Sequence, residues 1–377
     1  TSALRVQLDM TTEILLAFQG VRPQLPRPMT EADPKLRPSH GLGELLRLAW
    51  PVVLSRLGII TMGLTDAIVV GRYSSEELAF HALGWAPTSV LLTTAVGLLM
   101  GVQVMTARLI GTGRPQEVGA VLRRGISYSL QIGLVSALML VLAGPWGMHR
   151  IGIEPDLADG ASAALIIFSL SLPMYLVSVA CQFFLEGLER PTPGMNAMWV
   201  ANGVNLALNL WLVPGLSGLP VDGAVASAWA TFFARASLAG FLGVYIWRMG
   251  DARALGVFNR ESGRPEDARE QRKVGYAAGA SYCVEVSAFA ALTLVAGLLG
   301  SLGVAAWTVV LNVSAMVFMV PLGLSAATGV LVSNAYGRGD PAGVQRAGWT
   351  GVAVVGVLAF VIALVVWPAA GWISSAY

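Results

Sequence analysis

A gapless internal repeat constrains the fold of this chain more than any other feature of its sequence. The segment 97–125 (GLLMGVQVMTARLIGTGRPQEVGAVLRRG) aligns without insertion with 323–351 (GLSAATGVLVSNAYGRGDPAGVQRAGWTG). The identical positions are Gly97/Gly323, Leu98/Leu324, Val104/Val330, Gly111/Gly337, Gly113/Gly339, Pro115/Pro341, Val118/Val344 and Gly125/Gly351. Soluble solenoids repeat at roughly 20–50 residues, so this longer period indicates two homologous halves. Duplicated membrane halves are typical of secondary transporters, which handle substrate at the interface between the halves.

Composition places the halves in a membrane. Hydrophobic residues make up 55% of the chain and charged residues only 12%, whereas soluble domains carry about 25% charged residues. A membrane-spanning helix needs about 20 mostly apolar residues. Nine stretches meet this requirement: 48–70, 80–110, 119–145, 160–185, 194–214, 223–247, 274–297, 303–333 and 345–370. The sequence therefore predicts an all-α, polytopic membrane protein.

Cations gather in every second connection between the predicted spans. These connections hold Arg108, Arg114, Arg123 and Arg124, then Arg190, then the basic residues of 248–273, then Arg338 and Arg346. The other connections hold only Arg72 and Arg150. Because positive charge marks the cytoplasmic side, this alternation predicts a cytoplasmic N-terminus and a cytoplasmic 248–273 segment.

The repeat and the charge pattern together predict four regions. Residues 1–41 form a cytoplasmic leader, partly disordered or non-native, with Met29 as a plausible start. Residues 42–248 form a first bundle of six helices, and 249–273 form a solvated cytoplasmic linker. Residues 274–377 form three helices of an expected six. Parallel duplication predicts that helices 1–3 and 7–9 are related by a pseudo-two-fold rotation about the membrane normal.

Four ionisable side chains fall inside the predicted spans: Asp66, Glu285, Arg56 and Arg235. A charge at the bilayer centre costs ~2.5–3.5 kcal/mol, so each of them points to function. Asp66 is either an acceptor for a proton or Na⁺ or a helix-capping residue. Glu285, near the midplane, either serves ion or substrate binding or pairs with a buried arginine. Arg56 is near enough to the cytoplasmic end to extend to it, and Arg235 is expected to pair with a carboxylate.

Three asparagines share one face of the fifth predicted helix. Asn205 and Asn209 are four residues apart, and Asn202 precedes Asn205 by three. Their amide oxygens suit Na⁺ coordination or a hydrogen bond to Asp66, although helix–helix hydrogen bonding is an alternative use. Thr231 adds a hydroxyl oxygen on the sixth helix. The three histidines and two cysteines are scattered, so no cofactor and no other metal site is expected.

Six segments of the chain carry short motifs in a fixed order. They read GELLRLAWPVVLSRLGIITMGLTDAIVVGRY, GLLMGVQVMTARLIGTGR, FFLEGLERPTPGM, NGVNLALNLWLVPG, VDGAVASAWATFFAR and GASYCVEVSAFAALTLVAGLLGSLG. Together they resemble multidrug and toxic compound extrusion (MATE) transporters over about residues 42–377. The resemblance implies twelve helices in two bundles of six, and a monomeric exporter in the inner (plasma) membrane. It also implies antiport of small organic, cationic or amphipathic compounds with H⁺ or Na⁺, in which Glu285 serves the coupling ion or the substrate. Some members carry an aspartate on the fifth helix where this chain has asparagine.

Two alternatives stay open at the level of sequence. A flippase for lipid-linked or polysaccharide precursors belongs to the same superfamily, but its cavity is expected to be richly cationic. A membrane-embedded enzyme needs an acid cluster, a His/Cys metal set, or a nucleophile with its base. Motifs of these kinds are missing from the sequence, so no enzyme activity and no nucleic-acid partner is predicted. The expected partners are small-molecule substrates and the lipid bilayer.

Overall fold

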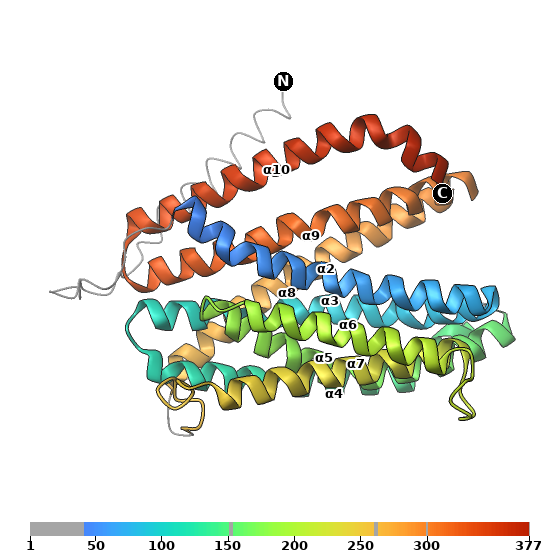
Figure 1. Cartoon of the computed structure of the whole chain (residues 1–377), viewed down its shortest axis with the longest axis horizontal. Helices are drawn as coiled ribbons and strands as arrows, with labels where there is room; N and C mark the ends of the chain where they lie inside the picture. The colour runs from blue at the N-terminus through green and yellow to red at the C-terminus, as the bar shows by residue number, and fades with distance from the viewer. Residues whose placement is uncertain (1–40, 151–153, 260–262, 299–300, 377) are drawn as a thin grey trace. The chain divides into compact units, whose positions relative to one another are not determined.

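The computed structural model describes residues 41–150, 154–259, 263–298 and 301–376, and these residues form helices and turns without strands. The long helices are α2 (Leu42–Tyr73), α3 (Ser75–Gly111), α4 (Val118–Arg150), α5 (Pro155–Gly187), α6 (Thr192–Leu212), α7 (Gly223–Arg248), α8 (Pro265–Leu298), α9 (Ser301–Gly337) and α10 (Pro341–Ala376), with the short 3-10 helix η1 (Pro115–Glu117) before α4. The all-α prediction is confirmed, with the nine predicted helices in order (Figure 1). The predicted leader lies outside the described residues except for its last residue, Gly41.

Seven helices in the described part of the chain are long and apolar enough to cross a membrane. They are α2, α3, η1 with α4, α5, α7, and the stretches Val313–Gly337 of α9 and Pro341–Leu364 of α10. The predicted spans in α6 and α8 are not among the seven. In α6 the reason is composition, because its 21 residues include four asparagines.

The first six helices, α2–α7, form a bundle around α5. Helix α5 packs against α3, α4 and α7, while α6 packs against α7 and α2. Most of α5 is buried, and Phe168, Leu172, Leu176 and Phe184 are at most 1% exposed. A helix that is apolar all round is buried in this way.

The last three helices contact this bundle mainly through α2 and α3. Helix α8 packs mainly against α3, and α9 packs against α2, α3 and α10. Helices α9 and α2 approach each other closely at Gly323 of α9. A side chain there would place its Cβ only 2.9 Å from the Cα of Val53 on α2, so the absence of a side chain permits this contact. Helices α2 and α3 are therefore the shared wall between the two halves.

The connection from α7 to α8 differs from the predicted linker 249–273. Helix α8 begins at Pro265, nine residues before the predicted start of the seventh span. Before it, Ala252 and Leu255 are buried, and the Leu255 carbonyl accepts a hydrogen bond from Gly119 N at 2.7 Å. The prediction of a solvated linker is therefore wrong for this part, because apolar side chains within the charged run pack against the start of α4.

The sequence repeat reappears as a repeated turn at the ends of α3 and α9. Gly113 and Gly339 have φ angles of 71° and 68°, a left-handed conformation that favours glycine. Three backbone hydrogen bonds around Gly113 recur around Gly339 at positions shifted by the repeat. In the first copy the amides of Thr112, Gly113 and Arg114 donate to the carbonyls of Arg108, Ile110 and Leu109, respectively. In the second copy the amides of Arg338, Gly339 and Asp340 donate to the carbonyls of Asn334, Tyr336 and Ala335. This pattern is the Schellman helix end.

The two copies also meet at equivalent residues. A Cβ on Gly111 would collide with the Asn334 carbonyl oxygen, and a Cβ on Gly337 would collide with the Arg108 carbonyl oxygen. Gly111 corresponds to Gly337 in the repeat, and Arg108 corresponds to Asn334. This reciprocal contact is what a local two-fold relation produces. The ends of α3 and α9 therefore lie together, as expected for a parallel rather than an inverted repeat.

Candidate ion-coupling site

Asp66 is the centre of a polar cluster that joins three helices. It lies on α2 and is 3% exposed. Its Oδ1 atom accepts hydrogen bonds from Asn205 Nδ2 at 2.9 Å and from Asn209 Nδ2 at 2.8 Å, both on α6. Its Oδ2 atom accepts a hydrogen bond from Thr231 Oγ1 on α7 at 2.7 Å. These partners are neutral, so within the described part of the chain no cation is in hydrogen-bond contact with the carboxylate.

The spacing along α6 explains how two amides reach one carboxylate. Asn205 and Asn209 are one turn apart and are both fully buried. Asn205 Nδ2 also lies 3.3 Å from Thr231 Oγ1, which links α6 to α7. The predicted grouping of Asp66 with these three residues is therefore present in the structure.

Asn202 belongs to the same helix face but not to the Asp66 cluster. Its Nδ2 atom donates to the Gly58 carbonyl on α2 at 3.0 Å and to the Met198 carbonyl at 2.9 Å. The prediction placed Asn202 among the ion ligands, and its contacts instead fasten α6 to α2. The reason is geometric, because the turn that carries Asn202 meets α2 at Gly58, about two turns away from Asp66.

The cluster also holds oxygens that accept no hydrogen bond. The Oδ1 atoms of Asn205 and Asn209 are buried and have no hydrogen-bond partner in the described part of the protein. The same is true of Ser227 Oγ, one turn before Thr231 on α7. Buried polar atoms usually have partners. Hard cations prefer oxygen ligands, so an amide that turned its oxygen toward Asp66 would offer Na⁺ suitable coordination.

Two further buried polar residues, Ser227 on α7 and His81 on α3, are not among the predicted site residues. His81 is 7% exposed, its ring meets the Phe168 ring edge-on at 5.1 Å, and its Nε2 atom is buried without a hydrogen-bond partner in the described part of the chain. One signal was available for each residue. Ser227 precedes Thr231 by four residues, and His81 is one of only three histidines in the chain.

A second buried cluster surrounds Arg56 and Glu186. Arg56 Nη2 on α2 lies 3.3 Å from Glu186 Oε1 on α5, and Gln103 Nε2 on α3 donates to Glu186 Oε2 at 2.7 Å. The Arg56 guanidinium also lies 5.4 Å from the centre of the Phe183 ring. Arg56 is buried and pairs with Glu186, so the expectation that it extends to the cytoplasmic end of its helix is wrong. The predicted span 160–185 stops one residue before Glu186, whereas α5 continues to Gly187 and buries this side chain.

Arg235 on α7 is held by aromatic rings rather than by a carboxylate. Its guanidinium lies 4.8 Å from the centre of the Tyr175 ring and 5.1 Å from that of the Trp85 ring. Its Nη1 atom donates to Ser171 Oγ at 2.7 Å. Among the described residues no acid forms an ion pair with Arg235, so the predicted carboxylate partner is wrong. Cation–π contacts take the place of that partner.

Glu285 lies apart from the Asp66 cluster. It is half-buried on α8, a helix that packs mainly on α3. Across the described ranges, Glu285 forms no hydrogen bond and no ion pair. The structure therefore brings together Asp66, Asn205, Asn209 and Thr231, and leaves Glu285 separate.

Comparison with known proteins fits this architecture. The MatE family model matches residues 51–211 and 277–377. The chain is 56% identical over 335 residues to a probable multidrug resistance protein NorM of Caulobacter vibrioides, covering 89% of this chain and 71% of that protein. It is 30% identical over 332 residues to a protein of the same name from Pseudomonas putida, covering 86% and 71%.

Solved structures share the fold. One described as an outward-facing multidrug resistance MATE family transporter of the MOP superfamily has a TM-score of 0.80 and 20% identity, covering 88% of this chain and 73% of that one. A MOP superfamily transporter from Pyrococcus furiosus also has a TM-score of 0.80, with 19% identity and the same coverage. The helical fold, the matched family model and the relatives lead to one assignment: the chain belongs to the MATE family of multi-pass membrane transporters.

Proposed function

We propose that this protein exports small organic compounds, cationic or amphipathic, in exchange for H⁺ or Na⁺ bound at Asp66. The observation that carries the proposal is a buried carboxylate held only by neutral donors from two other helices. Among the described residues this carboxylate forms no ion pair and accepts hydrogen bonds only from neutral groups, so a mobile cation is a natural partner. The similarity to proteins named multidrug resistance protein supports small-molecule export.

Helix α2, which carries Asp66, can couple ion binding to a change in the packing of the two halves. Helix α2 contacts α6 and α7 through the Asp66 cluster and contacts α9 on its other side. Binding of a cation removes the net charge and requires the Asn205 and Asn209 amides to reorient. Both changes alter how α2 packs against α6 and α7, and therefore bias its packing against α9. A ligand shifts such an equilibrium only by its difference in affinity between the two states.

The proposal extends to orientation and to Glu285. We place the N-terminus, the α3–α4 turn and the start of α8 on the cytoplasmic side of the inner membrane, because the basic connections lie there. Glu285 is proposed to attract a cationic substrate or the coupling ion from the second half. The proposed transporter is a monomer with no cofactor. A phosphate-binding flippase is disfavoured, because both buried arginines, Arg56 and Arg235, are already engaged.

Export of a cationic dye from cells that lack their own exporters tests this function. Asp66→Asn keeps the shape of the side chain but cannot cycle between charged and neutral forms, so ion-driven export is expected to be lost. The exposed Glu266→Gln at the start of α8 is the matched control and is expected to export normally. Export at the unsubstituted rate by Asp66→Asn, with equal amounts in the membrane, would show that Asp66 is structural.

A further inference from the structure

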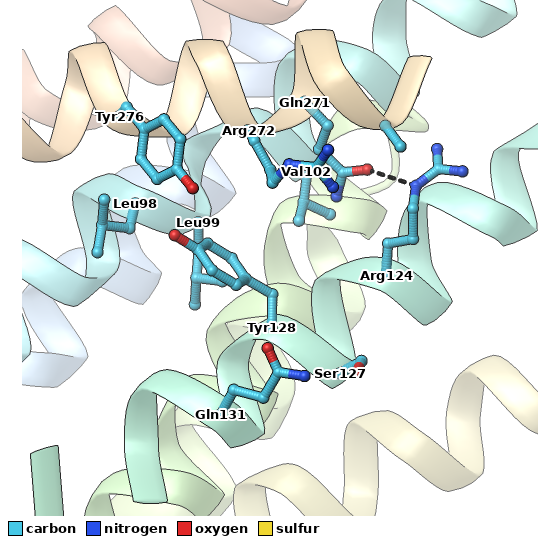
Figure 2. A pocket seen from close by; sticks show the side chains of 11 residues that line it. Leu98, Leu99, Val102, Arg124, Ser127, Tyr128, Gln131, Gln271, Arg272 and Tyr276 are labelled. Atoms are coloured by element: carbon cyan, nitrogen blue, oxygen red, sulfur yellow. Dashed lines mark hydrogen bonds between the residues drawn. The ribbon is translucent and has the colours of Figure 1, made fainter. Parts of the chain in front are cut away.

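A cavity of about 390 Å³ lies between α3, α4 and α8, outside the Asp66 and Arg56–Glu186 clusters. Its lining includes Arg124, Tyr128, Arg272 and Tyr276 together with Leu98 and Leu99 (Figure 2). Its volume is within the range of ligand pockets in proteins. The cavity joins the first bundle to the second half, because α3 and α4 belong to one and α8 to the other.

One part of the cavity carries positive charge that the protein does not neutralise. Arg124 Nε donates to Gln271 Oε1 at 3.1 Å, and its Nη2 atom is buried without a hydrogen-bond partner in the described part of the chain. Arg272 is exposed and forms no hydrogen bond or ion pair with the described residues. The acids whose charges reach Arg124 are Glu117 and Asp267.

Both of those acids are paired elsewhere. Arg114 Nε binds Glu117 Oε1 at 2.8 Å, and Arg114 Nη2 binds Asp267 Oδ2 at 2.7 Å. Two guanidinium groups therefore face the cavity without a bound carboxylate. The Tyr128 and Tyr276 hydroxyls face each other beside them and add further donors (Figure 2).

The rest of the cavity is apolar and leads to the lipid-facing surface of α4. Leu98, Leu99 and Val102 of α3 form one wall. On α4, Ser127 and Gln131 line the cavity, and Leu134 and Leu138 continue the same helical face, each 60% exposed. A molecule with a charged head in the cavity can therefore lay an apolar tail along these leucines.

We propose that this cavity binds the phosphate headgroup of an anionic glycerophospholipid. Arginine forms strong charge-assisted hydrogen bonds to phosphate, and basic pockets between membrane helices suit anionic headgroups. The apolar wall and the exposed leucines favour a lipid over free phosphate, which has no tail to occupy them. A lipid bound here contacts α4 and α8 together and stabilises their association. This inference depends on the membrane location of the chain and not on what it transports.

Lipid binding to the purified chain in detergent tests the proposal, by native mass spectrometry and by the thermal unfolding midpoint. Phosphatidylglycerol is expected to bind and to raise the midpoint, whereas phosphatidylcholine and inorganic phosphate are expected to do neither. Arg124→Gln/Arg272→Gln is expected to raise the apparent Kd for phosphatidylglycerol about tenfold, because charge-assisted hydrogen bonds are lost. The control Arg253→Gln/Arg346→Gln removes the same charge from exposed positions outside the cavity and is expected to bind as the unsubstituted chain does.

A variant that fills the cavity with a bulky side chain tests the site without removing any charge and without changing a buried residue. Ser127→Trp introduces bulk at an exposed position on the cavity rim and is expected to weaken phosphatidylglycerol binding with both arginines in place. Equal stabilisation by inorganic phosphate would overturn the assignment to a lipid. Unchanged phosphatidylglycerol binding in the double arginine variant and in Ser127→Trp, or equal weakening in the control, would overturn the site.

Discussion

The Asp66 cluster and the Arg56–Glu186 cluster each hold a buried carboxylate beside α2, yet the partners of the two carboxylates differ. The α2 members of the clusters, Asp66 and Arg56, lie about 15 Å apart by helical rise. Asp66 accepts hydrogen bonds from two amides and a hydroxyl, whereas Glu186 faces the guanidinium of Arg56 and the Gln103 amide. A carboxylate with a fixed cation has little need of a mobile one. Both carboxylates are buried, so burial does not distinguish them. The charge of the groups that contact each carboxylate distinguishes a candidate coupling site from a structural ion pair.

The two clusters also connect α2 to different neighbours. Asp66 reaches α6 and α7, while Arg56 reaches α5, the most enclosed helix of the first bundle. A fixed pair at the centre of the bundle gives α2 a stable anchor. The proposed ion-exchange site, Asp66, is ten residues further along α2, where a change of charge would alter the contacts with α6 and α7.

The largest expected effect comes from breaking the fixed pair. Arg56→Gln or Glu186→Gln leaves one buried charge without its partner and should destabilise the protein by about 3–5 kcal/mol. Arg56→Met/Glu186→Met removes both charges and should recover most of that loss. Unfolding of the purified chain in detergent measures both. Equal destabilisation by the singles and the double variant would mean that the ion pair itself contributes the stability.

An intermediate effect is expected from Na⁺ at Asp66. If Na⁺ is the coupling ion, a concentration ten times its Kd should stabilise the folded chain by about 1.4 kcal/mol relative to choline. Asp66→Asn should abolish this stabilisation, and Arg56→Met/Glu186→Met should retain it. Thermal unfolding in matched NaCl and choline chloride provides the measurement. Absence of a Na⁺ effect in the unsubstituted chain would assign the coupling to H⁺.

The smallest effect is expected at Asn202, which borders the Asp66 cluster. Asn202→Leu removes the hydrogen bond to the Gly58 carbonyl and should cost about 0.5–1.5 kcal/mol of stability. Ion-driven dye export should persist, because Asn202 does not contact Asp66. Loss of export at unchanged membrane levels would place Asn202 inside the coupling site, as its helix face first suggested.

Features that depend on the spacing of residues within one helix were predictable from the sequence. The number and order of the helices, the repeat and the shared face of Asn205 and Asn209 all depend on spacing within a segment. Sequence reasoning failed for Arg56 and Arg235, and it did not identify Glu186 as a buried partner. Arg56 and Glu186 are 130 positions apart, and no local pattern relates them. Arg235 is held by aromatic rings from α3 and α5, which serve equally well as packing residues when seen in the sequence alone.

The amino-acid sequence by itself determined the membrane location, the helices, the two-fold duplication and the face of α6 that carries the amides. These follow from hydropathy and helical periodicity, which depend on neighbouring residues only. The tertiary structure alone decided which carboxylate obtains a cation, which amide reaches Asp66, and where α3 and α9 meet at Gly111 and Gly337. Those outcomes depend on how close distant helices approach, because hydrogen bonds and ion pairs act over only a few ångströms.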